Sequence, residues 1–131
     1  MATKLDFDLA KKSATMAGQL LVLFRDSALN SGITSNTLGS MADRRSHDLL
    51  HDMILNVVPH DVIFSEEQDD DLRRLSSHRV WIIDPLDGTK EYSELNRSDW
   101  AVHVALVENG IPTVGAVALP DRGITFCSND I

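Results

Sequence analysis

The sequence predicts an α+β protein in which two helices precede a mainly antiparallel sheet. Apolar residues recur at helical spacing in the first half of the chain and alternate at strand spacing in the second half. Turn dipeptides separate the alternating runs, and helices followed by antiparallel strands are typical of the α+β class. With 131 residues, 43% of them apolar and 24% charged, the chain has the length and composition of one globular domain.

The first half of the chain predicts two helices. Residues 30–40 hold two glycines and several hydroxyl and amide side chains without periodicity, which indicates a loop between the helices. A second apolar stripe indicates a helix over 41–57, which Pro59 ends. The first helix, over 6–29, is predicted from one stripe of eight apolar residues: Leu9, Ala10, Ala14, Ala17, Leu20, Leu21, Phe24 and Ala28.

The middle of the chain predicts two short strands. An apolar run at 62–64 ends in the acidic pair 66–67. The acidic segment 69–77 has room for one or two helical turns. Residues 80–83 form a compact run of β-forming side chains, which indicates a buried strand.

The last third predicts three strands joined by turns. Residues 100–107 alternate, with Trp100, Val102, Val104 and Leu106 on one face of the strand. The Asn-Gly pair at 109–110 indicates a tight turn into a partner strand over 113–119. Residues 120–123 indicate a second turn, and 124–127 a third short strand.

The charge balance excludes several classes of partner. Acidic side chains outnumber basic ones by 20 to 12, and the formal charge is -8. This argues against a nucleic acid polymer or an anionic membrane, since both require basic patches. The single cysteine excludes an internal disulfide and a cysteine-built zinc site. Because no apolar stretch reaches the ~18 residues of a membrane span and residues 1–12 lack the order of a secretion signal, a cytoplasmic protein is expected.

The chemistry of the sequence is concentrated in the motif D-P-L-D-G-T at 84–89. The buried strand delivers Asp84 to its end, and Pro85 turns the chain so that Asp87 can return to the same side. Two carboxylates at a rigid turn suit magnesium. Gly88 lets a ligand approach the backbone closely, and the free amides of a helix that begins there would hold a phosphate oxygen.

Other acidic residues lie upstream of this motif. If the strand that ends in Glu66 and Glu67 is a neighbour of the strand that ends in Asp84, Glu66 can bridge to the same metal. The alternative is a solvated acidic turn. Asp43 stands at the start of the predicted second helix, where it either takes part in catalysis or complements the charge of the helix N-terminus. The sequence leaves both interpretations open.

Three segments of the chain resemble the inositol monophosphatase superfamily of magnesium-dependent, lithium-sensitive phosphatases. They are A-D-R at 42–44, S-E-E at 65–67 and W-I-I-D-P-L-D-G-T at 81–89, in the order of the family. Three further segments are more like the 3′(2′),5′-bisphosphate nucleotidase branch than the inositol branch: 90–92, 99–106 and 118–123.

The resemblance implies roles for particular residues. It implies a metal site built from Glu66, Asp84, the backbone carbonyl of Leu86 and Asp87. It implies that the substrate phosphate contacts the same region, at Glu66, Leu86, Asp87, Gly88 and Thr89. Asp43 and Thr89 would take a proton from the attacking water, with Glu67 in support. The family loop before Asp43 is mobile and helps to close the site, and residues 30–40 have the composition for that role.

The resemblance also implies a cofactor, a substrate and a larger fold. The cofactor is Mg²⁺, with two or three ions in the complete layered α/β/α/β/α fold of the family. The substrate is a small phosphorylated molecule: 3′-phosphoadenosine 5′-phosphate, or alternatively inositol 1-phosphate or fructose 1,6-bisphosphate. Family members are longer than this chain and carry a Trp-Asp pair that it lacks. Residues 1–131 are therefore expected to be a single domain, the N-terminal half of such a phosphatase with the C-terminal half absent, that binds one magnesium weakly and turns over slowly or not at all.

Three alternative interpretations remain open. Haloacid dehalogenase-type phosphatases carry Asp-x-Asp-Gly-Thr, whereas one additional residue separates Asp84 from Asp87 here. His47 and His51 have the i, i+4 spacing of two zinc ligands, although two surface histidines are the simpler interpretation. A non-catalytic partner or homodimer would instead use an exposed strand edge near 125–127.

Overall fold

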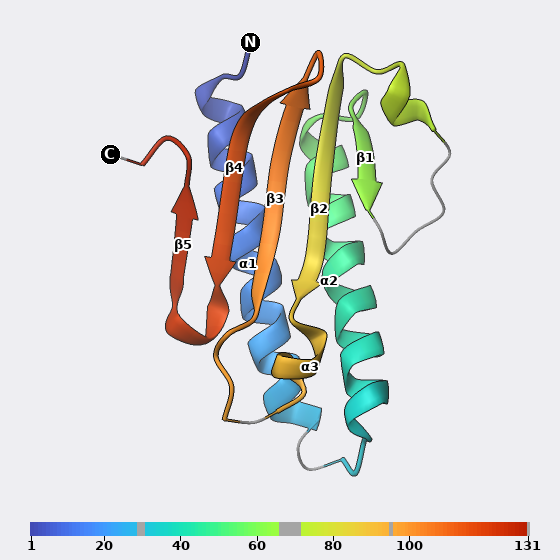
Figure 1. Ribbon diagram of the computed structural model, residues 1–131, viewed down its shortest axis with the longest axis vertical. Helices are drawn as coiled ribbons and strands as arrows, with labels where there is room; N and C mark the ends of the chain where they lie inside the picture. The colour runs from blue at the N-terminus through green and yellow to red at the C-terminus, as the bar shows by residue number, and fades with distance from the viewer. Residues whose placement is uncertain (29–30, 66–71, 95, 131) are drawn as a thin grey trace.

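Two long helices cover one face of a five-stranded sheet in the computed structural model, which describes residues 1–28, 31–65, 72–94 and 96–130 (Figure 1). The prediction of helices followed by a mainly antiparallel sheet is confirmed. None of the helices that the structure describes is both long and apolar enough to cross a membrane. The elements in chain order are α1 (Lys4–Ala28), α2 (Ser35–Val57), β1 (Val62–Ser65), η1 (Arg73–Leu75), β2 (Arg79–Asp87), α3 (Thr89–Tyr92), β3 (Ala101–Glu108), β4 (Ile111–Leu119), η2 (Pro120–Arg122) and β5 (Ile124–Cys127).

The strands lie in sequence order, β1-β2-β3-β4-β5. β1 pairs with β2 in parallel, with Ser65 opposite Ile83, and the other pairs are antiparallel. The prediction that the strand before Glu66 neighbours the strand of Asp84 is therefore confirmed, while Glu66 and Glu67 themselves lie outside the described residues. β5 forms an edge, and Phe126 on it is 56% exposed; its pairing with a second copy of the chain stays a prediction.

The core lies between the helices and one face of the sheet. The predicted alternation in β3 is confirmed, since Val102, Val104 and Leu106 are fully buried. His103 lies at an alternate position of the strand and is partly exposed. Because successive side chains of a strand point to opposite faces, His103 lies on the face that the helices leave uncovered. The helix side of the core is closed by small residues of α1, among them Ala10, Ala14 and Ala17.

The loop predicted over 30–40 is wrong for its second half, because α2 begins at Ser35. Thr34 caps the helix, and its hydroxyl accepts a hydrogen bond from the amide of Thr37 at 3.3 Å. The first turn is polar and exposed, so it carries no apolar stripe that a periodicity argument could find. Only Leu38 and Gly39 are buried before residue 40 in this helix. Residues 35–40 are therefore helical, and the expectation of a mobile loop that closes the site is wrong for this segment.

Buried charges hold together the end of the sheet where β2 begins. The guanidinium of Arg79 lies 2.7 Å from Asp6 of α1, 2.9 Å from Asp61 before β1, and 3.1 Å from Glu108 of β3. Burial alone would raise the pKa of the Asp6 carboxyl, but hydrogen bonds from Arg79 and the Thr3 amide bring it below its ordinary value. These contacts, which we call the Arg79 cluster, join one helix to two strands.

Candidate active site

The motif at 84–89 lies at the other end of β2, where the strand leaves the sheet. Asp84 is directly opposite His103 of β3, and the register then shifts so that Asp87 lies opposite Ala101. The shift brings both carboxylates toward the same imidazole. Donor atoms of Asp84, Asp87 and His103 all lie within 4.8 Å of one another, and His103 Nε2 is 2.9 Å from Asp87 Oδ2.

Gly88 makes the turn that follows. Its φ of 87° lies in the left-handed region, and a Cβ there would lie 3.2 Å from the carbonyl oxygen of Asp99. The helix predicted to begin at this point is confirmed as the single turn α3, in which the Tyr92 amide donates to the Gly88 carbonyl at 2.8 Å. The Thr89 hydroxyl donates to the carbonyl of Leu86 at 3.5 Å.

Arg25 of α1 supports this turn from the core side, a role that the sequence analysis missed. It is 4% exposed, and its guanidinium donates to the carbonyl oxygens of Tyr92 and Arg97, each at 3.4 Å. The same group lies over the rings of Tyr92 and Trp100, 5.4 and 5.1 Å from their centroids. The available signal was an arginine at position 25, in line with the apolar stripe near the end of the predicted first helix.

Asp43 faces α3 from α2. It lies within the helix rather than at its start and is 8% exposed, so the interpretation as a charge at the helix N-terminus is wrong. A pocket of about 280 Å³ is lined by Gly39, Ser40, Asp43, Arg44 and Thr89. Asp43 and Thr89, which the resemblance pairs, therefore line the same pocket.

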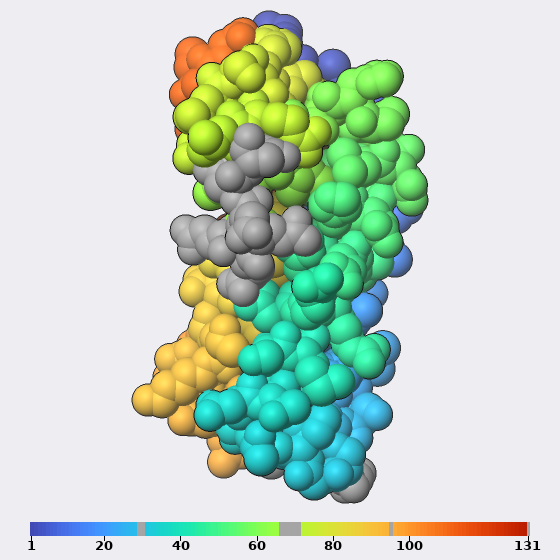
Figure 2. Space-filling view, turned by 90° about the vertical axis from the view of Figure 1, so that its right-hand side faces the viewer, coloured from blue at the N-terminus to red at the C-terminus, as the bar shows by residue number. Residues whose placement is uncertain are grey.

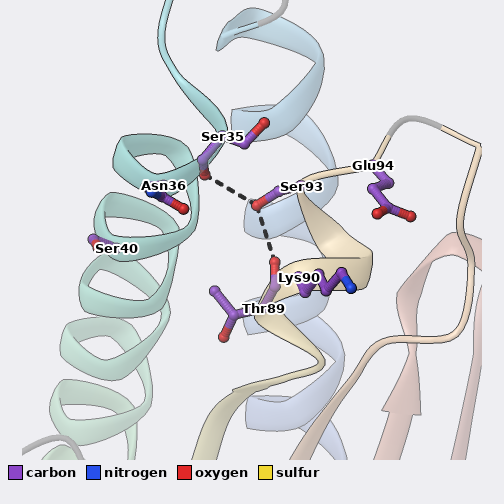
Figure 3. A pocket seen from close by; sticks show the side chains of 7 residues that line it. All are labelled: Ser35, Asn36, Ser40, Thr89, Lys90, Ser93 and Glu94. Carbon is purple, nitrogen blue, oxygen red and sulfur yellow. Dashed lines mark hydrogen bonds between the residues drawn. The ribbon is translucent and has the colours of Figure 1, made fainter.

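A second cavity, of about 400 Å³, lies beside the first and shares Ser40 and Thr89 with it. Figure 3 shows its lining from the first turns of α2 and from α3 with the two residues that follow it: Ser35, Asn36, Ser40, Thr89, Lys90, Ser93 and Glu94. The Ser93 hydroxyl is within hydrogen-bond distance of the carbonyls of Thr89 (2.9 Å) and Ser35 (3.1 Å). Figure 2 shows these two segments side by side on the surface.

The contact between α2 and α3 requires a glycine. A Cβ on Gly39 would lie 2.6 Å from Cγ2 of Thr89 and 3.3 Å from Oγ of Ser93. The absence of a side chain at this position lets the helix that carries Asp43 approach the turn that carries Thr89.

Comparison with known proteins identifies the family of this site. A model of the inositol monophosphatase family matches residues 2–129. The chain belongs to the inositol monophosphatase family. This assignment removes the haloacid dehalogenase alternative for the motif at 84–89.

Within the family, the chain is similar to mycobacterial proteins named 3′-phosphoadenosine 5′-phosphate phosphatase. It is 53% identical to the one from Mycobacterium tuberculosis over 92 residues, which cover 66% of this chain and 34% of that protein. It is 44% identical to the one from Mycobacterium leprae over 128 residues, 90% of this chain and 46% of that protein. The chain thus spans between a third and a half of the length of these relatives.

The fold agrees with the family. Inositol monophosphatase-II from Staphylococcus aureus superposes with a TM-score of 0.84 at 22% identity, over 96% of this chain and 46% of that one. At this identity the likeness supports the fold alone.

The donor set at the end of β2 fits a divalent cation. Inositol monophosphatases are metal-dependent, and carboxylate oxygens are the ligands that magnesium prefers in proteins. Asp87 is 59% exposed and His103 40% exposed, so an ion can reach them from solvent. Among the residues that the structure describes, these are the histidines and carboxylates close enough to share a metal. Of the predicted ligands, Asp84 and Asp87 come together, and Glu66 lies outside the described residues.

Two histidines lie in settings that the sequence pattern does not show. His103 has no partner in the sequence pattern, but strand register pairs it with Asp84 and its ring contacts Asp87. The interpretation of His47 and His51 as two surface histidines is wrong for His47, which is 2% exposed. Its ring stacks on His51 at a centroid distance of 5.8 Å. His47 is buried, whereas the side chain of His51 is 40% exposed, and the described residues offer the pair no third metal ligand.

Proposed function

We propose that this chain is the metal- and phosphate-binding portion of a magnesium-dependent phosphatase that hydrolyses 3′-phosphoadenosine 5′-phosphate to AMP and phosphate. The observation that carries the proposal is the grouping of Asp84 and Asp87 at the end of β2, next to the turn of Thr89. The names of the mycobacterial relatives support the nucleotide as substrate. The chain spans only part of those relatives, so the complete activity belongs to the proposal as well.

The metal site in this proposal consists of carboxylates and one backbone carbonyl. Glu66, Asp84 and Asp87 would hold Mg²⁺ together with the carbonyl oxygen of Leu86. Bound divalent cations neutralise the charge of the phosphate and lower the pKa of a bound water. Leu86 is 4% exposed, so its side chain anchors the turn in the core, and its carbonyl oxygen, which accepts a long hydrogen bond of 3.5 Å from the Thr89 hydroxyl, would take this role.

The phosphate contacts in this proposal come from the turn after β2. The amides of Gly88 and Thr89 would donate to phosphate oxygens, which approach closely because Gly88 has no side chain. Oγ1 of Thr89 would accept a proton from the attacking water while its own proton passes to the carboxylate of Asp43. Glu67 would support this proton transfer. The pocket that Asp43 and Thr89 share supports the pairing.

Calorimetric titration of the chain with 3′-phosphoadenosine 5′-phosphate tests the function. The titration is run in magnesium and in chelator, beside phosphate release from this nucleotide, inositol 1-phosphate and fructose 1,6-bisphosphate. We expect binding of the nucleotide to require magnesium and to weaken at least about tenfold in Asp84→Asn. Of the three phosphate esters, we expect the nucleotide to be hydrolysed fastest, although slowly.

The matched control is Asp26→Asn, which removes an exposed carboxylate of α1 and is expected to bind as the parent does. Nucleotide binding that is unchanged in chelator and in Asp84→Asn would overturn the proposed function.

A further inference from the structure

We infer that His103 is a nitrogen ligand of the metal centre and raises its preference for a transition ion such as Zn²⁺ over Mg²⁺. The inference rests on the proposed function in one respect, since it uses the same carboxylates, Asp84 and Asp87. It adds a side chain from a different strand and a consequence for metal choice.

The pairing of β2 with β3 places His103 beside the carboxylates of the proposed metal centre. In an antiparallel pair, side chains of directly opposite residues have Cβ atoms about 4.5–5.5 Å apart on one face of the sheet. Asp84 and His103 are such a pair. The register shift after Asp84 then brings Asp87 within reach of the same ring, although Asp87 lies opposite Ala101.

The distances suit a shared ion. His103 Nε2 and Asp87 Oδ2 are 2.9 Å apart, and the third donor, on Asp84, lies within 4.8 Å of both. Two donors that bind one ion at about 2.1 Å and at right angles are about 3.0 Å apart. A bound ion would draw the Asp84 carboxylate, within 4.8 Å of the other two donors, into a three-donor arrangement with positions left open for water or a phosphate oxygen.

The chemistry of the donors decides the metal. Magnesium takes oxygen ligands and keeps several of its waters, so an imidazole adds little to its binding. Imidazole suits zinc and other transition ions, which take mixed nitrogen and oxygen donors. Two carboxylates with one imidazole therefore bind transition ions more tightly than two carboxylates alone.

A structural role for His103 is a weaker explanation of its position. An exposed ion pair contributes about 0–1 kcal/mol to stability, and both partners of the His103–Asp87 contact are more than a third exposed. On β4, the residue opposite His103 is Val117, on the uncovered face of the sheet. Replacement of His103 consequently leaves the core between helices and sheet intact.

The test compares metal binding by the chelator-treated chain with binding by His103→Ala. Calorimetric titrations with Zn²⁺ and with Mg²⁺ give the affinities, and long-range ¹H–¹⁵N spectra of the imidazoles show which ring nitrogen binds zinc. We expect zinc affinity to fall at least about tenfold in the variant, magnesium affinity to change less than twofold, and the Nε2 signal of His103 to shift with zinc in the parent.

Two control variants separate the outcomes. His60→Ala removes an exposed histidine before β1 and is expected to keep the zinc affinity of the parent. Zinc affinity that drops in His51→Ala but not in His103→Ala would place zinc on α2 and overturn the inference.

Failure of the inference is also distinct from failure of the proposed function. If His103→Ala keeps full zinc affinity while Asp84→Asn loses magnesium binding, His103 is no ligand and the proposed magnesium centre stands. If Asp84→Asn keeps both metals, the proposed centre fails and the inference fails with it.

Discussion

The two ends of β2 both gather carboxylates, but they meet different partners. Where the strand begins, the guanidinium of Arg79 contacts three carboxylates at 2.7 to 3.1 Å, and two of these, Asp6 and Glu108, are buried. Where the strand ends, Asp87 contacts the imidazole of His103 in an exposed setting.

The difference separates a structural charge cluster from a binding site. A guanidinium is charged at any accessible pH, so the Arg79 cluster carries its own cation as part of the fold. An imidazole carries no permanent charge and can exchange a carboxylate contact for a metal. The first end is therefore expected to determine stability, and the second end to determine binding.

The largest effect is expected from Arg79→Met. The substitution leaves the buried Asp6 without its cation, whereas Glu108 keeps its contact with the N-terminal amino group of Met1 at 3.3 Å. Removal of one partner of a buried ion pair costs about 3–5 kcal/mol of the free energy of unfolding. Urea denaturation measures it. Arg122→Met, on an exposed arginine of η2, is the control and is expected to change stability by less than about 0.5 kcal/mol. Equal midpoints for the two variants would show that the cluster does not hold the fold together.

A smaller effect on stability is expected from Gly39→Ala. This variant tests whether the contact between α2 and α3, beside the motif at 84–89, depends on close packing. The new Cβ would meet Cγ2 of Thr89 at 2.6 Å, and overpacking of this kind costs about 1–3 kcal/mol. Urea denaturation is again the measurement. The second substitution Thr89→Ser removes the methyl group and should restore most of the loss. Gly115→Ala is the control, because a Cβ at this position would have no atom within 4 Å. A loss of stability in Gly115→Ala as large as that in Gly39→Ala would refute the steric explanation.

The smallest effect is expected from the protonation of Asp6. Its pKa is lower in the folded chain than the ordinary value of 3.8, so the unfolded chain binds the proton more readily. The stabilisation is complete well above pH 4 and is lost as the pH falls through the folded pKa. The slope for this one proton is at most about 1.4 kcal/mol per pH unit.

Denaturation between pH 3 and 6 measures this dependence. As the pH falls, the free energy of unfolding should decrease less steeply in Asp6→Asn than in the parent. It should also decrease less steeply than the parent in Arg79→Met, because that variant lacks the partner that lowers the pKa of Asp6. An identical pH dependence in all three proteins would contradict this account.

Much of the fold follows from local patterns in the sequence. The stripe of α1, the alternation of β3 and the Asn109–Gly110 turn each depend on residues that follow one another closely along the chain, and the structure confirms all three. The motif at 84–89 is equally local, because a buried strand, a proline and a glycine determine the turn. The sequence by itself thus determined the class of the fold and the position of Asp84, Asp87 and Thr89 at the end of a strand.

Only the tertiary structure decided what surrounds that motif. The early start of α2 at Ser35 accompanies contacts with α3, such as that between Ser93 and Ser35, which a periodicity argument does not see. The pairing of His103 with Asp84 depends on strand register, and the support from Arg25 depends on the packing of α1. The physical reason is the same in each case: these contacts join residues that are far apart along the chain, so their geometry is set when helices and sheet pack together and not by their neighbours in sequence.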